Sequence, residues 1–422
     1  MNKRAIRIFA AAALCAPLLA FGQKNSCVEC HSQLDDDLKA PAVALAADIH
    51  AEFGLSCKAC HGGDPSQDDV DLAKDKTFKG SPKRKDIPQF CGGCHADPAA
   101  MRAFNPALRT DQLSQYWTSR HGQLLKAGDT KAAVCTDCHG VHGIQSAKYP
   151  KSLTFPWNIP QTCGRCHADK AYMEPYKLPT GQLEDYGGSV HARALLEKKD
   201  LSAPVCNDCH GNHGAFPPSV TSVASVCRQC HPSTGELFMK SPHKKAFDEM
   251  GAGECEICHG NHKILAPSTA MIGTDDGATC VQCHDKGSRG FEAAAEFRRQ
   301  LDGFESGFRA AEGLLAQARQ KGVEVSDAEF KLQDVTTLLV SAKNLTHGLD
   351  GAEIAKAVSE GEKSLVGVRE LGEKALDEAS FRRRGLAVTT ALLALFGVAL
   401  ALKIRHMTRV RRAAEGRGGS PS

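Results

Sequence analysis

The apolar residues of this chain are distributed in four distinct ways along its length. One apolar run covers residues 8–21, and a second, uncharged and mostly aliphatic, covers residues 385–402. Between residues 291 and 375, apolar residues recur with the 3.6-residue spacing of an α-helix. Residues 23–288 show no sustained period and contain many Gly and Pro residues. We therefore expect a mostly α fold with extensive coil, in which short helices and loops precede longer helices.

The periodic segment, residues 289–384, predicts a helical bundle or stalk of three antiparallel helices. Ser326 and Glu329 fit a capping box at the start of the middle helix. The apolar faces comprise Phe297, Leu301, Phe304, Phe308, Ala311, Leu315 and Ala318 in the first helix, Val335, Leu338, Leu339, Ala342 and Leu345 in the second, and Ile354, Val358, Leu365, Val368 and Ala375 in the third.

The N-terminal apolar run has the flanks of a secretory signal. Three basic residues precede it, and small residues end it before polar Gln23, so residues 1–22 are predicted to be a signal peptide cleaved after Gly22. An uncleaved anchor is the alternative, but the run is short for a bilayer. Cleavage also removes Cys15.

The C-terminal apolar run, residues 385–402, is long enough for a short transmembrane helix. Three arginines precede it and a strongly basic tail, residues 403–422, follows it. The excess of positive charge after the run predicts a single pass with the tail in the cytoplasm and the preceding domain in the periplasm. The alternative interpretation is that residues 385–402 form a buried core helix. His406 is expected to be an ordinary tail residue.

The net charge of +3 averages over unlike regions. Without residues 1–22 and 403–422, the central part has 48 acidic and 43 basic residues. This acidic balance argues against nucleic-acid binding. Only 6% of residues are aromatic, whereas 19 are cysteine, so something other than large side chains must fill the core of residues 23–288.

All the cysteines except Cys15 belong to nine CxxCH motifs. The first cysteines are Cys27, Cys57, Cys91, Cys135, Cys163, Cys206, Cys227, Cys255 and Cys280; the second are Cys30, Cys60, Cys94, Cys138, Cys166, Cys209, Cys230, Cys258 and Cys283; the histidines are His31, His61, His95, His139, His167, His210, His231, His259 and His284. Two thiols on one turn can each add to a vinyl group of one porphyrin, and the adjacent His can bind its iron.

The motifs therefore predict nine covalently bound haem c groups. Disulfides would not require a His after every second Cys, and zinc ribbons belong mostly to reducing compartments. With about 29 residues per motif, the haems themselves are expected to form the core of residues 23–288.

A repeated plan supplies further histidines. Residues 121–167, 191–231 and 243–284 each contain an upstream His, then CxxCHGxH, then a plain CxxCH. The last His of CxxCHGxH cannot reach the far side of its own haem and must serve a neighbour. These spare histidines, predicted to be distal ligands, are His121, His191 and His243 upstream and His142, His213 and His262 within the longer motif.

The first stretch breaks this plan, because residues 27–95 contain three motifs but one spare, His50. If the later repeats balance internally, the first stretch lacks two distal ligands. His347, at the end of the middle bundle helix, is a candidate for one of the two missing distal ligands. The alternative interpretation is that it is a solvated residue at a helix end. At least one haem then lacks a distal His, and Met101, Lys, the new N-terminal amine or water could take that position.

Residues 27–284, about three-fifths of the chain, resemble the low-potential, bis-histidine multihaem c-type cytochromes of the class III-like, doubled-CxxCH kind. The resemblance implies an electron carrier, here anchored in the cytoplasmic membrane and facing the periplasm. The expected donor is a membrane quinol-oxidising subunit or the quinone pool, and the expected acceptor is a periplasmic or outer-surface protein with a basic face. Some relatives are enzymes, so the alternative is an oxidoreductase that converts a small nitrogen or sulfur compound at one open haem.

Overall fold

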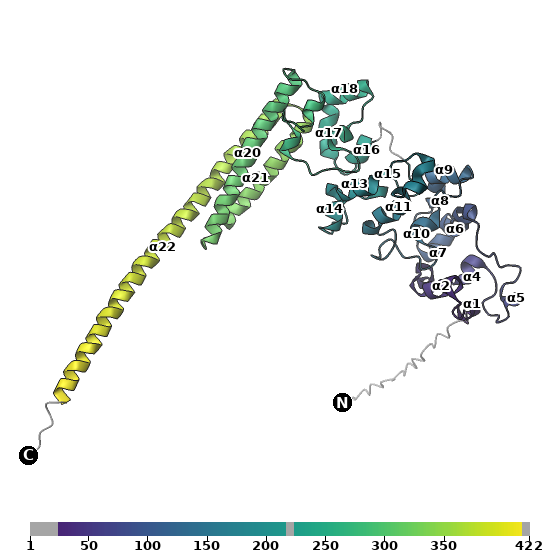
Figure 1. Cartoon of the computed structure of the whole chain (residues 1–422), viewed down its shortest axis with the longest axis horizontal. Helices are drawn as coiled ribbons and strands as arrows, with labels where there is room; N and C mark the ends of the chain where they lie inside the picture. Colours follow the sequence, from purple (N-terminus) through teal and green to yellow (C-terminus); the bar gives the residue numbers. More distant parts are fainter. Residues whose placement is uncertain (1–23, 217–222, 416–422) are drawn as a thin grey trace, which may run out of the picture. The chain divides into compact units, whose positions relative to one another are not determined.

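The computed structural model describes residues 24–216 and 223–415 (Figure 1). The predicted signal segment, residues 1–22, lies outside these residues. The chain divides into two compact units, residues 1–218 and 219–422. The division falls inside the predicted haem region 23–288, and the domain boundaries expected from the sequence stay predictions. The described residues form helices and loops and contain no strand, as the absence of alternating patterns predicted.

The first unit consists of short helices joined by loops. Its elements are α1 (Ser26–His31), α2 (Asp36–Ala44), η1 (Leu45–Ala47), α3 (Ile49–Glu52), α4 (Cys57–His61), α5 (Val70–Ala73), η2 (Arg84–Asp86), α6 (Ile87–His95), α7 (Pro98–Phe104), α8 (Gln112–Thr118), α9 (Arg120–Lys126), α10 (Cys135–His139), η3 (Pro156–Asn158), α11 (Ile159–His167), α12 (Lys170–Met173), η4 (Glu174–Tyr176), α13 (Gln182–Gly187), α14 (Val190–Leu196) and α15 (Cys206–His210).

The second unit begins with further short helices and ends with three long ones. Its elements are α16 (Val223–Arg228), α17 (Pro232–Lys240), α18 (Pro242–Met250), α19 (Cys255–His259), η5 (Thr269–Met271), η6 (Cys280–Gln282), α20 (Arg289–Gln320), α21 (Ser326–Leu345), η7 (Thr346–Gly348) and α22 (Gly351–Glu415).

The three long helices pack side by side as the predicted bundle (Figure 1). Their core contains the apolar faces expected from the sequence, with Leu301, Phe304, Val335, Ile354 and Val368 fully buried. Burying side chains of this size stabilises a bundle by roughly 1.5–3 kcal/mol each relative to exposure. The bundle prediction is confirmed.

The expected capping box at the start of α21 is wrong. Ser326 is the first helical residue rather than the cap, and its backbone N–H donates to Glu324 Oε1 at 3.0 Å. Glu329 instead accepts a hydrogen bond from Arg319 Nη1 at 3.0 Å. The carboxylate two residues before the helix thus takes the capping role that the sequence pattern assigned to Ser326.

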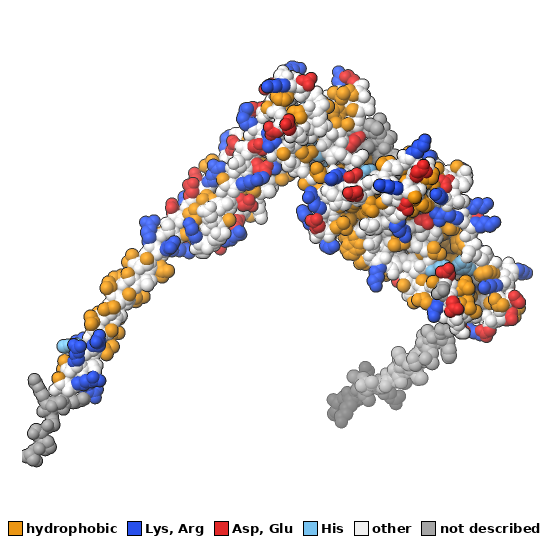
Figure 2. Space-filling model, viewed as in Figure 1, with side chains coloured by type: hydrophobic (Ala, Val, Ile, Leu, Met, Phe, Trp, Pro, Cys, Tyr) orange, Lys and Arg blue, Asp and Glu red, His pale blue; other side chains and the backbone are white. Residues whose placement is uncertain are grey.

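α22 continues without a break from the bundle through the apolar run. The run has no buried residue, and α22 is long and apolar enough to cross a membrane. Figure 2 shows hydrophobic side chains along this part of α22 and Lys and Arg side chains beyond it. Eighteen helical residues measure about 27 Å, close to the hydrocarbon thickness of a bilayer. Because no loop interrupts α22, the bundle and the membrane segment form one continuous rod.

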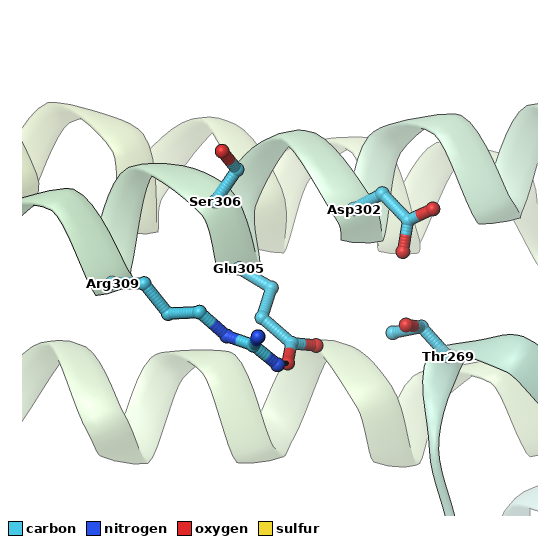
Figure 3. A pocket seen from close by; sticks show the side chains of 5 residues that line it. All are labelled: Thr269, Asp302, Glu305, Ser306 and Arg309. Carbon is cyan, nitrogen blue, oxygen red and sulfur yellow. Dashed lines mark hydrogen bonds and ion pairs between the residues drawn. The ribbon is translucent and has the colours of Figure 1, made fainter.

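A polar seam joins the loop around η5 to α20. Arg298 Nη1 donates to the carbonyl oxygens of Thr269 at 2.9 Å and Ile272 at 3.2 Å. A shallow pocket beside this seam is lined by Thr269, Asp302, Glu305, Ser306 and Arg309 (Figure 3). Lys343 Nζ lies 2.8 Å from Glu305 Oε2 and lowers the pKa of that carboxyl. The seam therefore ties the residues between the last motifs to the bundle.

Candidate haem-binding sites

Most CxxCH motifs occupy a single helical turn. Seven of the nine form the end of a helix that terminates at the motif His, namely α1, α4, α6, α10, α11, α15 and α19. The motif at Cys227 begins at the end of α16, and the motif at Cys280 lies on the 3₁₀ turn η6. None of the eighteen motif cysteines is in a disulfide. All these thiols therefore remain for thioether bonds.

Six motif histidines each have one spare histidine opposite their ring. The ring centres are 5.9–6.1 Å apart in the pairs His95–His50, His61–His142, His167–His121, His139–His213, His284–His243 and His259–His347. Every pair combines one motif His with one spare His.

This geometry fits an iron held between two imidazoles. Metal–nitrogen bonds of about 2 Å on both sides would place the ring centres roughly 6 Å apart. The angles between ring planes range from 9° to 75°. Free rotation about a nitrogen–iron–nitrogen axis permits such a range, whereas direct aromatic packing prefers fewer arrangements. No group of three or more His, Cys, Asp or Glu in the described residues could itself hold a metal ion. The residues thus suit haem rather than zinc.

Hydrogen bonds at Nδ1 leave Nε2 for a metal at several of these rings. Nδ1 of His31 lies 2.8 Å from the carbonyl of Leu38, and Nδ1 of His61 lies 3.0 Å from that of Gly80. His347 makes the same contact with the carbonyl of Asn344 at 2.9 Å. A ligating His usually donates its other N–H in this way, which fixes the ring orientation.

His50 has a stronger partner, the buried carboxylate of Asp48. Its Nδ1 donates to Asp48 Oδ1 at 2.9 Å, and Asp48 Oδ2 accepts the backbone N–H of Ile144, also at 2.9 Å. Burial alone would raise the pKa of Asp48, but these hydrogen bonds lower it overall. Asp48 is therefore an ionised hydrogen-bond partner of the His50 ring and lies two residues before it in the chain.

Burial keeps the candidate ligands neutral. It lowers the pKa of His139 to about 4 and also lowers the pKa of seven others, which are His95, His121, His142, His167, His213, His243 and His259. Neutral imidazole is the form that binds a metal.

A buried serine positions each upstream histidine. Ser119, Ser189 and Ser241 each lie two residues before an upstream His and are at most 5% exposed. The side chains of Ser119 and Ser189 accept backbone N–H groups of the first turns of α9 and α14. They fix the helix start that carries the histidine. A Ser-x-His pattern at these three positions is visible in the sequence and could have identified them.

Glycine directs the other spare histidines away from their own motif. Gly140 and Gly211 follow the motif His with φ of +88° and +83°. This left-handed conformation ends the helix at the motif and is easily adopted only by Gly. His142 then lies opposite His61, and His213 lies opposite His139. Each therefore faces the histidine of an earlier motif, as expected for a histidine that cannot reach its own haem.

The expectation that the repeats balance internally is therefore wrong. Within residues 121–167, His121 faces His167, but His142 faces a motif outside the repeat. As a result, the motif at Cys57 has a spare histidine opposite its own histidine. The histidine opposite His259 is His347, from the bundle. His50 stands opposite His95, so that motif needs no ligand from Met101. The backward pairing arises because the Gly turn directs the chain towards the motif two places earlier in the sequence.

Five spare or motif histidines are not in these pairs. His191, His210, His231 and His262 each have interaction partners, and their ligand roles stay predictions from the repeat. His31 has the contact with Leu38 described above, and no histidine ring lies opposite it in the described residues.

The motifs follow one another in space in sequence order within each unit. In the first unit, Cys57 interacts with Cys27, Cys60 with Cys91 and Cys94, Cys91 with Cys135, Cys138 with Cys166, and Cys163 with Cys206. In the second, Cys227 interacts with Cys255, and Cys258 with Cys280 and Cys283. The helix pairs α6–α10, α11–α15 and α16–α19 are in contact accordingly.

Comparisons with known families agree with this geometry. The cytochrome c3 family model matches residues 49–168, and the model of the doubled CXXCH motif matches residues 248–289. No curated protein and no solved structure matches the chain significantly. Both matched segments contain CxxCH motifs, so these parts of the chain are similar to multihaem c-type cytochromes, and the similarity supports haem c binding.

Proposed function

We propose that this protein carries electrons along nine covalently bound haem c groups, between a quinol-linked donor in the cytoplasmic membrane and an acceptor in the periplasm or at the cell surface. When bound, haem supplies one-electron chemistry at its iron. The observation that carries the proposal is the order of the motifs. Within each unit, the cysteines of every motif lie near enough to those of the next motif to affect their pKa, so the attachment sites form continuous rows rather than isolated centres.

The residues around the motifs perform three tasks in this proposal. The cysteines hold each porphyrin, the motif and spare histidines bind its iron from both faces, and burial keeps these imidazoles neutral. Two histidine ligands for one iron would leave no position open for a substrate, which suits electron transfer.

The continuous helix α22 supports the membrane part of the proposal. It would hold the haem-binding units at a bilayer surface, with the basic tail in the cytoplasm by the positive-inside rule. One transmembrane helix offers little room for a quinone pocket. We therefore propose a separate quinol-oxidising subunit as the donor.

The haem count is tested by the intact mass of the mature protein. We expect nine haem increments and no titratable thiol, because all eighteen cysteines that remain after cleavage belong to motifs. Eight or fewer increments in fully matured protein would contradict the count.

Charge selects the acceptor in this proposal. The region between the basic ends has more acidic than basic residues, and ionised haem propionates add further negative charge. Oxidation of the reduced protein by a basic redox protein, followed by stopped flow, should slow roughly tenfold as salt screens the attraction. A neutral small-molecule oxidant is the control and should show little dependence on salt. Rates with the basic partner that do not respond to ionic strength would count against an acceptor with a basic face.

A further inference from the structure

The histidines of the chain do not suffice for nine irons with two imidazoles each. The chain contains 18 histidines, all within the described residues, and nine belong to motifs. One of the other nine, His406, lies in the tail beyond the apolar run of α22. Eight distal candidates therefore face nine motifs. One iron must lack a distal histidine from this chain.

The contacts identify the motif concerned. Six motif histidines have a spare histidine ring opposite them, and His210 and His231 have interaction partners of their own. No histidine ring lies opposite His31 in the described residues, and its polar contact runs from Nδ1 to the carbonyl oxygen of Leu38. This contact leaves Nε2 for iron, as at the other sites, but provides nothing for the opposite face. The deficit falls on the motif at Cys27.

Other side chains near this motif are poorly placed to replace a histidine. The sequence contains no Met between residues 24 and 100. Lys24 Nζ is paired with Asp68 at 2.5 Å. The motif also lies at the end of the row in its unit, where only the motif at Cys57 adjoins it. A small molecule could therefore reach this position from solvent.

From these observations we infer that His31 is the sole axial ligand that the chain supplies to the haem at Cys27 and Cys30, so that this haem has an exchangeable position for a small neutral ligand. Asp35 and Asp37, four and six residues after His31, are exposed and would repel anions. The inference rests on the proposed haem loading and adds a ligand-binding site at one end of a row. If the protein instead converts a small nitrogen or sulfur compound, this haem is where the compound would bind.

The test uses carbon monoxide and the full-length, haem-loaded protein. Reduced wild-type protein should bind one carbon monoxide per chain, and the oxidised protein should show one high-spin signal in electron paramagnetic resonance. The double variant Cys27→Ser/Cys30→Ser should bind none and lose the high-spin signal. The matched double variant Cys280→Ser/Cys283→Ser removes the motif at the other end of the sequence, whose histidine is paired, and should still bind one.

Two exposed carboxylates allow a test that does not disturb folding or haem attachment. Asp35→Asn/Asp37→Asn should bind cyanide several-fold more tightly while its affinity for carbon monoxide stays unchanged, because only the anion is repelled. Wild-type protein that binds no carbon monoxide and has only low-spin haem would overturn the inference. So would binding that survives loss of the Cys27 motif, or cyanide affinity indifferent to the two carboxylates. Mass and low-spin signals report the other haems separately, so these results would leave electron carriage intact.

Discussion

At the scale of single residues, Asp48 connects two candidate ligand sites. One of its carboxylate oxygens accepts a hydrogen bond from the ring of His50. The other accepts a hydrogen bond from the backbone N–H of Ile144, two residues after His142. The carboxylate is nearly buried, with 6% exposure, so its charge is only weakly screened. It should therefore increase the electron donation of His50 to an iron and favour the oxidised state.

The substitution Asp48→Asn tests this effect. We expect the potential of one haem to rise by roughly 60 mV, which corresponds to a tenfold change in its oxidised-to-reduced ratio. A redox titration followed by electron paramagnetic resonance measures this change. Asp71→Asn removes the same charge from an exposed position and serves as the control. Equal potentials in wild type and Asp48→Asn, or equal shifts in both variants, would contradict the role of Asp48.

At the scale of elements, the short turn η7 links the bundle to a haem site. It carries His347, whose ring centre is 6.0 Å from that of His259. Neighbouring contacts fix its position, since Thr234 Oγ1 donates to Asn344 Oδ1 at 2.6 Å and α17 packs against η7. The turn that follows α21 therefore places a bundle histidine at the candidate haem site of His259.

Replacing this histidine should change one haem only. In His347→Ala, one low-spin haem is expected to become high-spin, because His259 would remain as the only histidine ligand of its iron. Added imidazole should restore the low-spin signal, which a merely structural defect would not allow. His406→Ala is the matched control, since His406 lies exposed in the tail. Retention of every low-spin signal in His347→Ala would show that His347 is not a ligand.

At the scale of the whole molecule, one helix combines packing with anchorage. Residues of α22 up to Ala375 fill the bundle core, whereas the apolar run further along is fully exposed. An exposed run of this kind is costly in water and is stable in lipid. The bundle part does not need the membrane part for its own core.

Deletion of residues 385–422 should consequently release a soluble protein that retains all its haems. Cell fractionation and haem absorbance measure the outcome. Deletion of residues 403–422 alone retains the apolar run and should leave the protein in the membrane. A truncated protein that stays in the membrane, or one that lacks haem, would refute the separation of anchorage from haem binding.

The sequence alone determined the chemistry that is local along the chain. Two cysteines and a histidine within five residues specify covalent attachment because spacing on one turn suffices, and helical periodicity predicted the core of α20, α21 and α22 because those faces repeat every 3.6 residues. The start of α21 escaped prediction, since a carboxylate outside the expected pattern caps it.

Tertiary structure decided which spare histidine faces which motif. His142 and His213 reach backwards to His61 and His139, and His347 reaches His259 from another element. Counting histidines showed that distal ligands are too few, but it placed the deficit only among the first three motifs. The assignment to Cys27 needed the folded chain, because a distal ligand must approach the iron from the opposite face and therefore comes from a segment distant in sequence.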